Sequence, residues 1–380
     1  MSGETTYLFF DLPLTGKIPG FKEEDGFGLF PFWGQFRALD FAYANTLDDR
    51  IPHHNGMWHY VVSSRDYHAS LIDHGESRNT GCSVIDDDID LKEFVSLLKR
   101  LETKRVLCYS LSSVILMDSR NLDSLVSRCG RDEIFKIEVD GTPQNIFCCD
   151  RKRLIALIER TYPAGSSGFS PESLFRDVLD IYFTSMEELD AVGVFQNSLQ
   201  ELYLGNLLLK RIGSKGIPRF FEEIEVSARE SSIGTRGTVI GSILSPGVRV
   251  EGTVRNSILF EGVHVRSGAE VVNSVVLPGN HIGRGARLDT VLLFPNFADT
   301  AGQPNIGEAA VIGGSSRAVN RTHPEHIYDG LTVIGFNGDI PAQHVVEPAA
   351  FIDSYTPRRA IKAYGTIKRS AAVEEQLVRR

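Results

Sequence analysis

Short aliphatic triplets recur at nearly equal intervals in the second half of the chain. The first, Ser242-Ile243-Leu244, is followed by three similar triplets at steps of 15, 17 and 16 residues, and a Pro-Gly or Glu-Gly turn signal follows each of the first three. A coil of a triangular β-helix needs three short strands with inward aliphatic side chains, and coils are stable only when stacked. The pattern predicts a parallel β-helix over residues 231–355, with Ile258 pointing inward. The later triplets are Ser257-Ile258-Leu259, Ser274-Val275-Val276 and Thr290-Val291-Leu292.

The first 215 residues alternate between strand-like and helix-like patterns. Apolar residues at 91, 94, 95, 97, 98 and 101, for example, have the spacing of a helix with one buried face. Such alternation predicts a mainly parallel sheet covered by helices, over residues 1–215. Residues 216–230 are then a linker, and residues 356–380 a C-terminal tail. Strands are expected at 6–10, 57–63, 106–109 and 145–149, and helices at 36–47, 66–74, 90–101, 122–126, 151–160 and 171–183.

Length, charge and cysteine content narrow the class of protein. The 380 residues exceed the size at which one hydrophobic core stops growing, which favours two domains. A net charge of −9 argues against nucleic acid or an anionic membrane as a partner. The chain has no run of 18 apolar residues and no basic region before an N-terminal apolar stretch, so neither a membrane span nor a secretory signal is expected. Five cysteines without C-x-x-C spacing favour a reducing compartment, and the sequence predicts a cytoplasmic protein.

Four segments of the first domain resemble segments of one enzyme family, in the same order along the chain. The longest is F-W-G-Q-F-R-A-L-D-F-A-Y-A-N at residues 32–45. It resembles the P-F-G-G-x-[FY]-R-x-I-D-F-x-L-S-N segment of ADP-glucose pyrophosphorylases. P-L-T at 13–15, S-L-I-D-H at 70–74 and residues 190–206 resemble that family's P-L-T, S-L-x-x-H and D-V-G-T…Y…A-N. The resemblance implies a nucleotidyltransferase-like (Rossmann-like) α/β domain followed by a left-handed β-helix of hexapeptide repeats.

The resemblance ends where the family has its catalytic groups. The family's G-G-x-G-T-R-L loop, whose glycines and arginine bind phosphates, is replaced by Y-L-F-F-D at residues 7–11. Its Mg²⁺-binding G-D-H turn is replaced by S-L-S-S at residues 110–113, and hydroxyls are poor ligands for a hard dication. Alignment on Val192-Gly193 puts Ala191 at the second metal-binding aspartate, and a one-residue slip would recruit Asp190. The family's F-x-E-K-P lysine segment has no counterpart. Because nucleotidyl transfer depends on positioning and charge compensation, the chain alone is expected to be inactive.

These losses make the chain most similar to the non-catalytic regulatory subunit of the family, which acts in glycogen biosynthesis. The resemblance implies a hetero-oligomer with a catalytic paralogue, expected to be a tetramer, or else self-association, and a sugar-phosphate or nucleotide effector. No catalytic residue, metal site or cofactor is expected, and Mg²⁺ is needed only if the chain is active. The candidate effector-binding residues are Arg37, Asp40 and Asn45. Arg37 and Asp40 share a helix face, so a structural ion pair explains them equally well.

Two further functions stay open at this point. One is an active glucose-1-phosphate adenylyltransferase, which converts ATP and glucose 1-phosphate to ADP-glucose and diphosphate. A phosphate-binding glycine loop would favour it, and the sequence has none in the expected place. The other is a homomeric sugar-phosphate sensor or scaffold. A neighbouring gene for a full-length paralogue would separate that function from the regulatory subunit.

Overall fold

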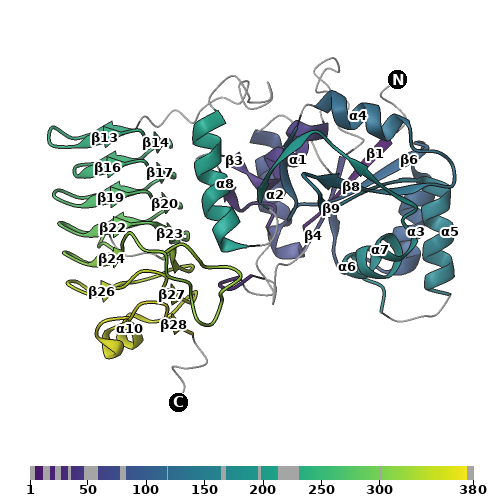
Figure 1. Cartoon of the computed structure of the whole chain (residues 1–380). Helices are drawn as coiled ribbons and strands as arrows, with labels where there is room; N and C mark the ends of the chain where they lie inside the picture. Colours follow the sequence, from purple (N-terminus) through teal and green to yellow (C-terminus); the bar gives the residue numbers. More distant parts are fainter. Residues whose placement is uncertain are drawn as a thin grey trace.

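The structure is a computed structural model of the 380-residue chain, in which an α/β domain and a β-helix lie side by side (Figure 1). No helix in the described ranges is both long enough and apolar enough to cross a membrane. The predicted linker at 216–230 lies outside the described residues. The described residues are 5–11, 18–21, 27–32, 36–46, 59–77, 83–117, 119–163, 168–195, 198–212, 231–298 and 302–374.

The α/β domain is built on a seven-stranded sheet in the order β10-β8-β9-β6-β1-β4-β5. β9 runs antiparallel to its neighbours β6 and β8, and the other neighbouring pairs are parallel. The predicted mainly parallel sheet is therefore confirmed. Its strands are β1 (Thr5–Phe10), β4 (His59–Ser63), β5 (Ser83–Asp86), β6 (Arg105–Ser110), β8 (Ile134–Val139), β9 (Thr142–Asp150) and β10 (Ser185–Glu188), and two small antiparallel pairs join β7 (Val114–Met117) to β11 (Ala191–Phe195) and β2 (Pro31–Phe32) to β3 (Phe36–Arg37).

Helices cover both faces of this sheet. α1, α2 and α4 pack on the face that carries Phe9, and α3, α5 and η4 pack on the face that carries Leu8. The side chains of Asp90, Asp150 and Ser170 each accept a backbone N–H bond at a helix start, as N-cap residues do. The helices are α1 (Ala38–Thr46), η3 (Arg65–Tyr67), α2 (His68–Ser77), α3 (Leu91–Arg100), α4 (Ser119–Ser127), α5 (Arg151–Thr161), α6 (Pro171–Ser173), η4 (Leu174–Leu179), α7 (Asp180–Tyr182) and α8 (Leu199–Ile212).

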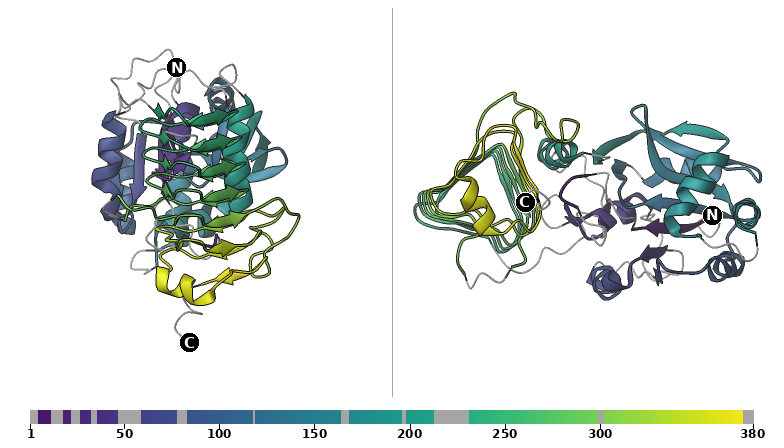
Figure 2. Two further views of the ribbon diagram at one scale, coloured as in Figure 1. Left: turned by 90° about the vertical axis from the view of Figure 1, so that its left-hand side faces the viewer. Right: turned by 90° about the horizontal axis from the view of Figure 1, so that it is seen from below.

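The second domain is a stack of coils with three parallel sheets as its sides, and its cross-section is triangular (Figure 2). The predicted fold class, an α/β domain followed by a hexapeptide β-helix, is confirmed. The first sheet contains β12 (Ser232–Ile233), β15 (Arg249–Val250), β18 (His264–Val265) and β21 (His281–Ile282). The second contains β13 (Thr238–Ile240), β16 (Thr253–Arg255), β19 (Glu270–Val272), β22 (Arg287–Asp289), β24 (Val311–Gly313) and β26 (Val345–Val346). The third contains β14 (Ile243–Leu244), β17 (Ile258–Leu259), β20 (Val275–Val276), β23 (Val291–Leu293), β25 (Thr332–Ile334), β27 (Phe351–Ile352) and β28 (Ala372–Val373).

The stacking register confirms the first three triplets and shifts the fourth by one residue. Ile258 pairs with Val275, and Val275 pairs with Leu292. The fourth triplet is therefore 291–293, so the predicted Thr290-Val291-Leu292 was wrong. Thr290 has a φ of 59° and occupies the left-handed corner that Asn273 occupies one coil earlier. Thr290 carries a hydroxyl, like the serine at the start of each other triplet, and this similarity explains why the sequence placed the fourth triplet one residue too early.

Ile258 does not point into the coil, contrary to the sequence-based prediction. Leu259 belongs to the interior cluster of the coils, whereas Ile258 belongs to a cluster shared with the α/β domain and α8. Both side chains are fully buried. The reason is that the third sheet is covered on its outer side, so its strands carry aliphatic residues on both faces.

The stack of coils continues beyond residue 355, where the sequence placed its end. β28 pairs in parallel with β27, and Ile367 bridges to Val346. The helix α10 (Arg358–Tyr364) lies between these strands in the chain, and it buries Ile361 against the interior cluster. Residues 356–374 thus form the last coil rather than a separate tail.

The two domains share one buried aromatic cluster, which we call the aromatic junction and define as Phe21, Phe27, Phe30, Phe294 and Phe336. Phe21 and Phe30 come from the α/β domain, and their ring centroids lie 5.2–6.2 Å from each other and from those of Phe294 and Phe336 in the β-helix. Aromatic pairs in this range are favourable beyond the area they bury.

The helix α8 and one N-terminal loop also join the domains. α8 stands along the third sheet of the β-helix (Figure 1), and the Tyr203 hydroxyl donates to the Asn273 carbonyl at 2.5 Å. The Ser354 hydroxyl donates to the Gly20 carbonyl, also at 2.5 Å. The interface is therefore continuous from α8 to the last coils.

Candidate functional site

The strand order places a topological switch point between β1 and β6. β4 and β5 lie on one side of β1, whereas β6, the next strand of the sheet in the chain, lies on the other. In open α/β sheets, ligands bind outside the carboxyl ends of the strands at such a point. The candidate site is therefore the edge formed by Asp11 after β1, Ser63 at the end of β4 and the turn at residues 110–113 after β6.

Asp11 occupies this edge and is bonded to the chain itself. Its Oδ1 accepts the backbone N–H groups of Phe27 and Gly28 at 2.6 and 2.7 Å, and its Oδ2 accepts the Ser63 hydroxyl at 3.0 Å. Burial raises the pKa of Asp11, although bonds from Gly28, Ser63 and Phe27 act in the opposite direction. Two backbone donors and a hydroxyl could also bind a phosphate. In this chain they bind the Asp11 side chain instead.

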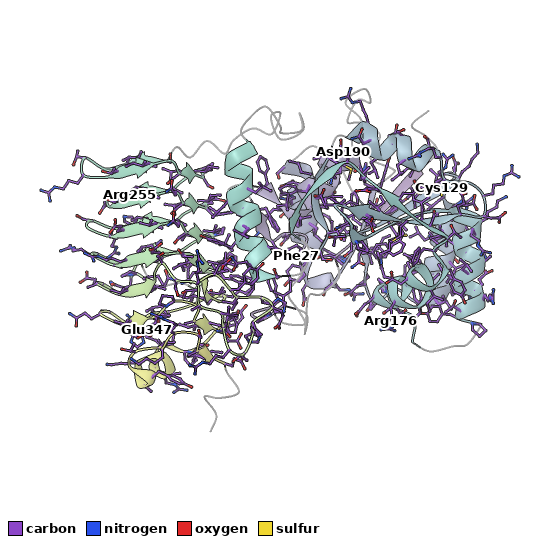
Figure 3. All side chains as sticks on the ribbon, in the orientation of Figure 1. Phe27, Cys129, Arg176, Asp190, Arg255 and Glu347 are labelled. Carbon is purple, nitrogen blue, oxygen red and sulfur yellow. The ribbon has the colours of Figure 1, made fainter. Side chains whose placement is uncertain are left out.

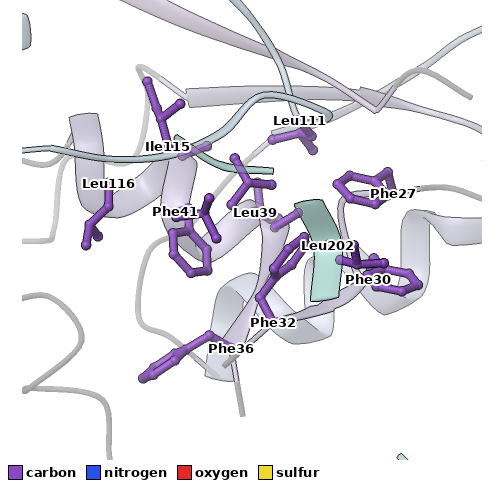
Figure 4. Close-up of a cluster of buried hydrophobic side chains, with 14 of the residues drawn as sticks. Phe27, Phe30, Phe32, Phe36, Leu39, Phe41, Leu111, Ile115, Leu116 and Leu202 are labelled. Atoms are coloured by element: carbon purple, nitrogen blue, oxygen red, sulfur yellow. The ribbon is translucent and has the colours of Figure 1, made fainter. Parts of the chain in front are cut away.

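The segment of residues 27–32 is held tightly over the end of β1. A Cβ added to Gly28 would lie 2.8 Å from Leu111 Cδ1, so a side chain there would displace Leu111. The Gly28 carbonyl accepts the Leu39 N–H, and the Phe30 carbonyl accepts the Ala38 N–H, which fixes the segment to the start of α1. Figure 4 shows Phe27 and Phe30 in one buried cluster with Leu111 and Leu202. The segment therefore fills the described part of the switch-point edge.

The turn after β6 contains hydroxyls bonded to one another. Ser110 Oγ and Ser112 Oγ lie 2.8 Å apart, and the Tyr109 hydroxyl donates to the Ser113 carbonyl at 2.8 Å. The described residues include no group of three His, Cys, Asp or Glu side chains that would hold a metal. Neutral hydroxyls do not fit a Mg²⁺ ion, which prefers carboxylate oxygens. The residues present at this turn thus do not fit the Mg²⁺ that the family resemblance implies.

Asp190 lies at the wrong end of its strand to join that turn. β11 runs antiparallel to β7, so that Ala191 pairs with Met117 and Phe195 pairs with Val114. The turn precedes Val114, whereas Asp190 precedes Ala191 at the opposite end, roughly 10 Å further along the strand. Asp190 is also exposed (Figure 3). The one-residue slip considered from the sequence therefore does not place Asp190 beside residues 110–113.

Of the three candidate effector residues, Arg37 directly precedes α1, Asp40 lies in its first turn and Asn45 near its end, and the last two are fully buried. Asp40 accepts the Arg37 backbone N–H at 2.7 Å, as an N3 residue does in a capping box, and its other oxygen lies 2.8 Å from His74 Nε2. Asn45 donates to the Ile115 carbonyl at 2.9 Å and accepts the Met117 N–H at 3.3 Å. These contacts favour scaffold roles for Asp40 and Asn45.

Arg37 differs from these two residues because its side chain is partly exposed. Its guanidinium donates to the Phe36 carbonyl at 3.1 Å. Its bond to Asp40 comes from the backbone, so the side chain can be removed without losing the helix cap. Effector binding by Arg37 stays a prediction.

Sequence reasoning missed the way in which His74 and Asp40 connect two of the resemblance segments. Asp40 lies in the segment of residues 32–45 and His74 ends the S-L-I-D-H segment, and a partly buried hydrogen bond joins them. It also missed that Asp11 accepts three hydrogen bonds. The available signal was an aspartate directly after an apolar strand, where parallel strands of a sheet end. The four described cysteines are buried and free, and Cys148 and Cys149 face opposite sides of the sheet.

His59 is a buried histidine whose neutrality contributes to stability. Its ring is stacked on Tyr7 with centroids 4.9 Å apart, and its Nε2 lies 3.2 Å from Thr46 Oγ1. Burial lowers the pKa of His59 to about 4 from 6.5. Between pH 6.5 and about 4, His59 therefore binds a proton in the unfolded chain but not in the folded chain. The free energy of unfolding falls as the pH drops through this range.

We expect His59→Phe to make stability less sensitive to acid. By linkage, His59 should account for about 2 kcal/mol of the loss in unfolding free energy between pH 7.5 and pH 5. Urea titrations of both proteins at the two pH values measure this difference. Burial also lowers the pKa values of His281, His326 and His344. These residues are present in both proteins, so their contributions to the pH dependence cancel in the comparison. Equal pH dependence in the two proteins would show that His59 is protonated in the folded state.

Fold and site together define the class: an α/β domain with a switch-point site, followed by a hexapeptide β-helix. Residues 227–316 match the family described as GlmU-like, C-terminal hexapeptide. Over 124 residues the chain is 32% identical to the glucose-1-phosphate adenylyltransferase of Acetivibrio thermocellus. That match covers 32% of this chain and 27% of the length of that protein. The similarities support a relation to ADP-glucose pyrophosphorylase-like nucleotidyltransferases.

Proposed function

We propose that this chain is a catalytically degenerate member of the ADP-glucose pyrophosphorylase family that regulates a catalytic paralogue in glycogen biosynthesis. The observation that carries the proposal is the Asp11 carboxylate, bonded to Phe27 and Gly28 at the switch point. It uses the backbone donors that would otherwise be available to a nucleotide phosphate.

A nucleotide phosphate at this edge would compete with the Asp11 side chain for the backbone N–H groups of Phe27 and Gly28. The neighbouring turn offers hydroxyls in place of the carboxylate that a Mg²⁺ ion prefers. These features support the loss of nucleotidyl transfer.

A subunit without catalysis can still change the response of a partner. Regulation requires a difference in binding free energy between two states of an assembly, typically ~1–3 kcal/mol. The α/β domain packs on the β-helix through α8 and the aromatic junction, and these contacts support coupling between the two domains. Such a subunit would bias the paralogue through their shared interfaces.

The first test is an assay of the purified chain with ATP, glucose 1-phosphate and Mg²⁺. We expect no ADP-glucose above the background of a mock purification, because the phosphate-binding loop and the metal-binding carboxylate are missing. Turnover that persists through repurification and changes in an Asp11→Asn variant would contradict the loss of catalysis and favour the active adenylyltransferase.

The second test compares effector titrations of the catalytic paralogue with and without this chain, on a complex whose mass is confirmed. We expect a shifted activation or inhibition curve. Arg37→Ala should reduce the shift if Arg37 binds the effector, and Arg176→Ala is a matched control because that exposed arginine pairs with Asp177 on the far side of the domain (Figure 3). Superimposable curves with and without the chain would reject regulation and leave the scaffold function.

A further inference from the structure

Three basic side chains form a row across the first sheet of the β-helix. Arg249, His264 and His281 occupy the same register position on β15, β18 and β21. Each is followed by a buried aliphatic residue that points into the coil, so the three side chains point outward. The rings of His264 and His281 have centroids 6.0 Å apart. At about 4.8 Å per strand, the row is roughly 10 Å long.

A second arginine, Arg266, lies beside this row. Arg266, one position beyond β18, adds a guanidinium that donates to the Gly302 carbonyl, which is neutral. Among the described residues, Glu251 lies 3.4 Å from His264. Asp339 is two coils further along the stack and lies 3.4 Å from Arg358. In a chain with a net charge of −9, Arg249 and Arg266 thus have no ion-pair partner among the described residues.

Hydrogen-bond donors in the row are not used by the described residues. The Arg249 guanidinium makes no hydrogen bond or ion pair within the described part of the chain. Nδ1 of His281 is buried and has no partner among the same residues. Burial, and then the charges of His264, Arg266 and Arg249, lower the pKa of His281. An anion placed here would accept hydrogen bonds from the Arg249 guanidinium and would offset the positive charge of Arg249 and Arg266.

We propose that this row binds a small anion that carries two linked phosphoryl groups. Arginine matches phosphate oxygens in a bidentate manner, and a histidine adds a donor on either side. A single phosphate contacts about one strand spacing, whereas a diphosphate reaches from Arg249 or Arg266 toward His281. The site lies on the first sheet, away from the switch-point edge, so it is independent of the proposed function.

The test is calorimetric titration of the full chain with inorganic diphosphate, without metal, at constant ionic strength. We expect saturable binding of one anion per chain, with a dissociation constant below about 1 mM. Arg249→Gln should weaken binding about tenfold or more, because it removes a charge-assisted pair. His281→Gln should weaken it as well, while thermal unfolding without diphosphate stays as in the wild type.

Arg287→Gln is the matched control, because Arg287 is also an exposed arginine of the same stack and lies on the neighbouring sheet. It removes the same charge from the chain and should leave diphosphate binding unchanged. The proposal is overturned if diphosphate does not saturate below about 10 mM, or if Arg249→Gln and Arg287→Gln bind it equally. Equal binding would mean that only the overall charge of the stack attracts the anion.

Discussion

Leu259→Asp should unfold the β-helix. Leu259 is fully buried among the interior side chains of the coils, where it stacks between Leu244 and Val276. A carboxylate at this position would lose its hydration without gaining a partner, at a cost of about 4 kcal/mol or more. That cost is a large part of the stability of an ordinary domain. We expect loss of the strand signal in far-ultraviolet circular dichroism, or failure to obtain folded chain.

Ile240→Asp provides the comparison for this change. Ile240 is an aliphatic residue of the same stack, but its side chain is 53% exposed. The same substitution there should lower the melting temperature by little, since surface changes are usually within about 0.5 kcal/mol. If Leu259→Asp and Ile240→Asp melt alike, Leu259 is not in the interior of the coil and the register of the stack is wrong.

Gly205→Val should separate α8 from the strand beneath it. A Cβ at residue 205 would lie 1.8 Å from the Val194 carbonyl oxygen, which is backbone and has little freedom to move. Overpacking usually costs about 1–3 kcal/mol, and a collision with the backbone belongs at or above the upper end of this range. Moving α8 would also break the bond from Tyr203 to Asn273. Chemical denaturation should show a loss of about 3 kcal/mol or more.

Leu204→Val introduces the same side chain one residue earlier in α8. Leu204 is 48% exposed, so this variant tests the effect of a β-branched residue on the helix alone. Its expected cost is about 0.5 kcal/mol. A Gly205→Val protein as stable as the Leu204→Val protein would mean that α8 lies further from β11 than the structure places it.

The repeat could be read from the sequence because its steps reflect the geometry of a coil. Three of four triplets were placed correctly, and the serines that open them continue from coil to coil: the Ser242 hydroxyl accepts the Ser257 N–H, and the Ser257 hydroxyl accepts the Ser274 N–H. Composition could not show which face of the third sheet is covered. Ile258 and Leu259 are equally apolar, and only the position of α8 distinguishes them.

The candidate site was less predictable, because its main feature joins residues far apart in the chain. The absence of the glycine loop was evident from residues 7–11, and the aspartate after the strand marked the edge of the sheet, but nothing local indicated that its partners would be Gly28 and Ser63. Similarly, the sequence places Asp190 next to Ala191, but the direction of β11 puts the end that contains Phe195, not Asp190, beside the turn at residues 110–113. Strand direction depends on tertiary pairing, which a single sequence does not encode in its hydrophobic pattern.

The aromatic junction limits how this chain can be divided. A fragment that began at residue 231 would present Phe294 and Phe336 to water, together with the outward aliphatic row to which Ile258 belongs. An apolar surface of this kind promotes association with whatever hydrophobic surface is nearest. The two domains are therefore not interchangeable modules. Exchanging either one for a homologous domain would require that the donor bring a matching aromatic face.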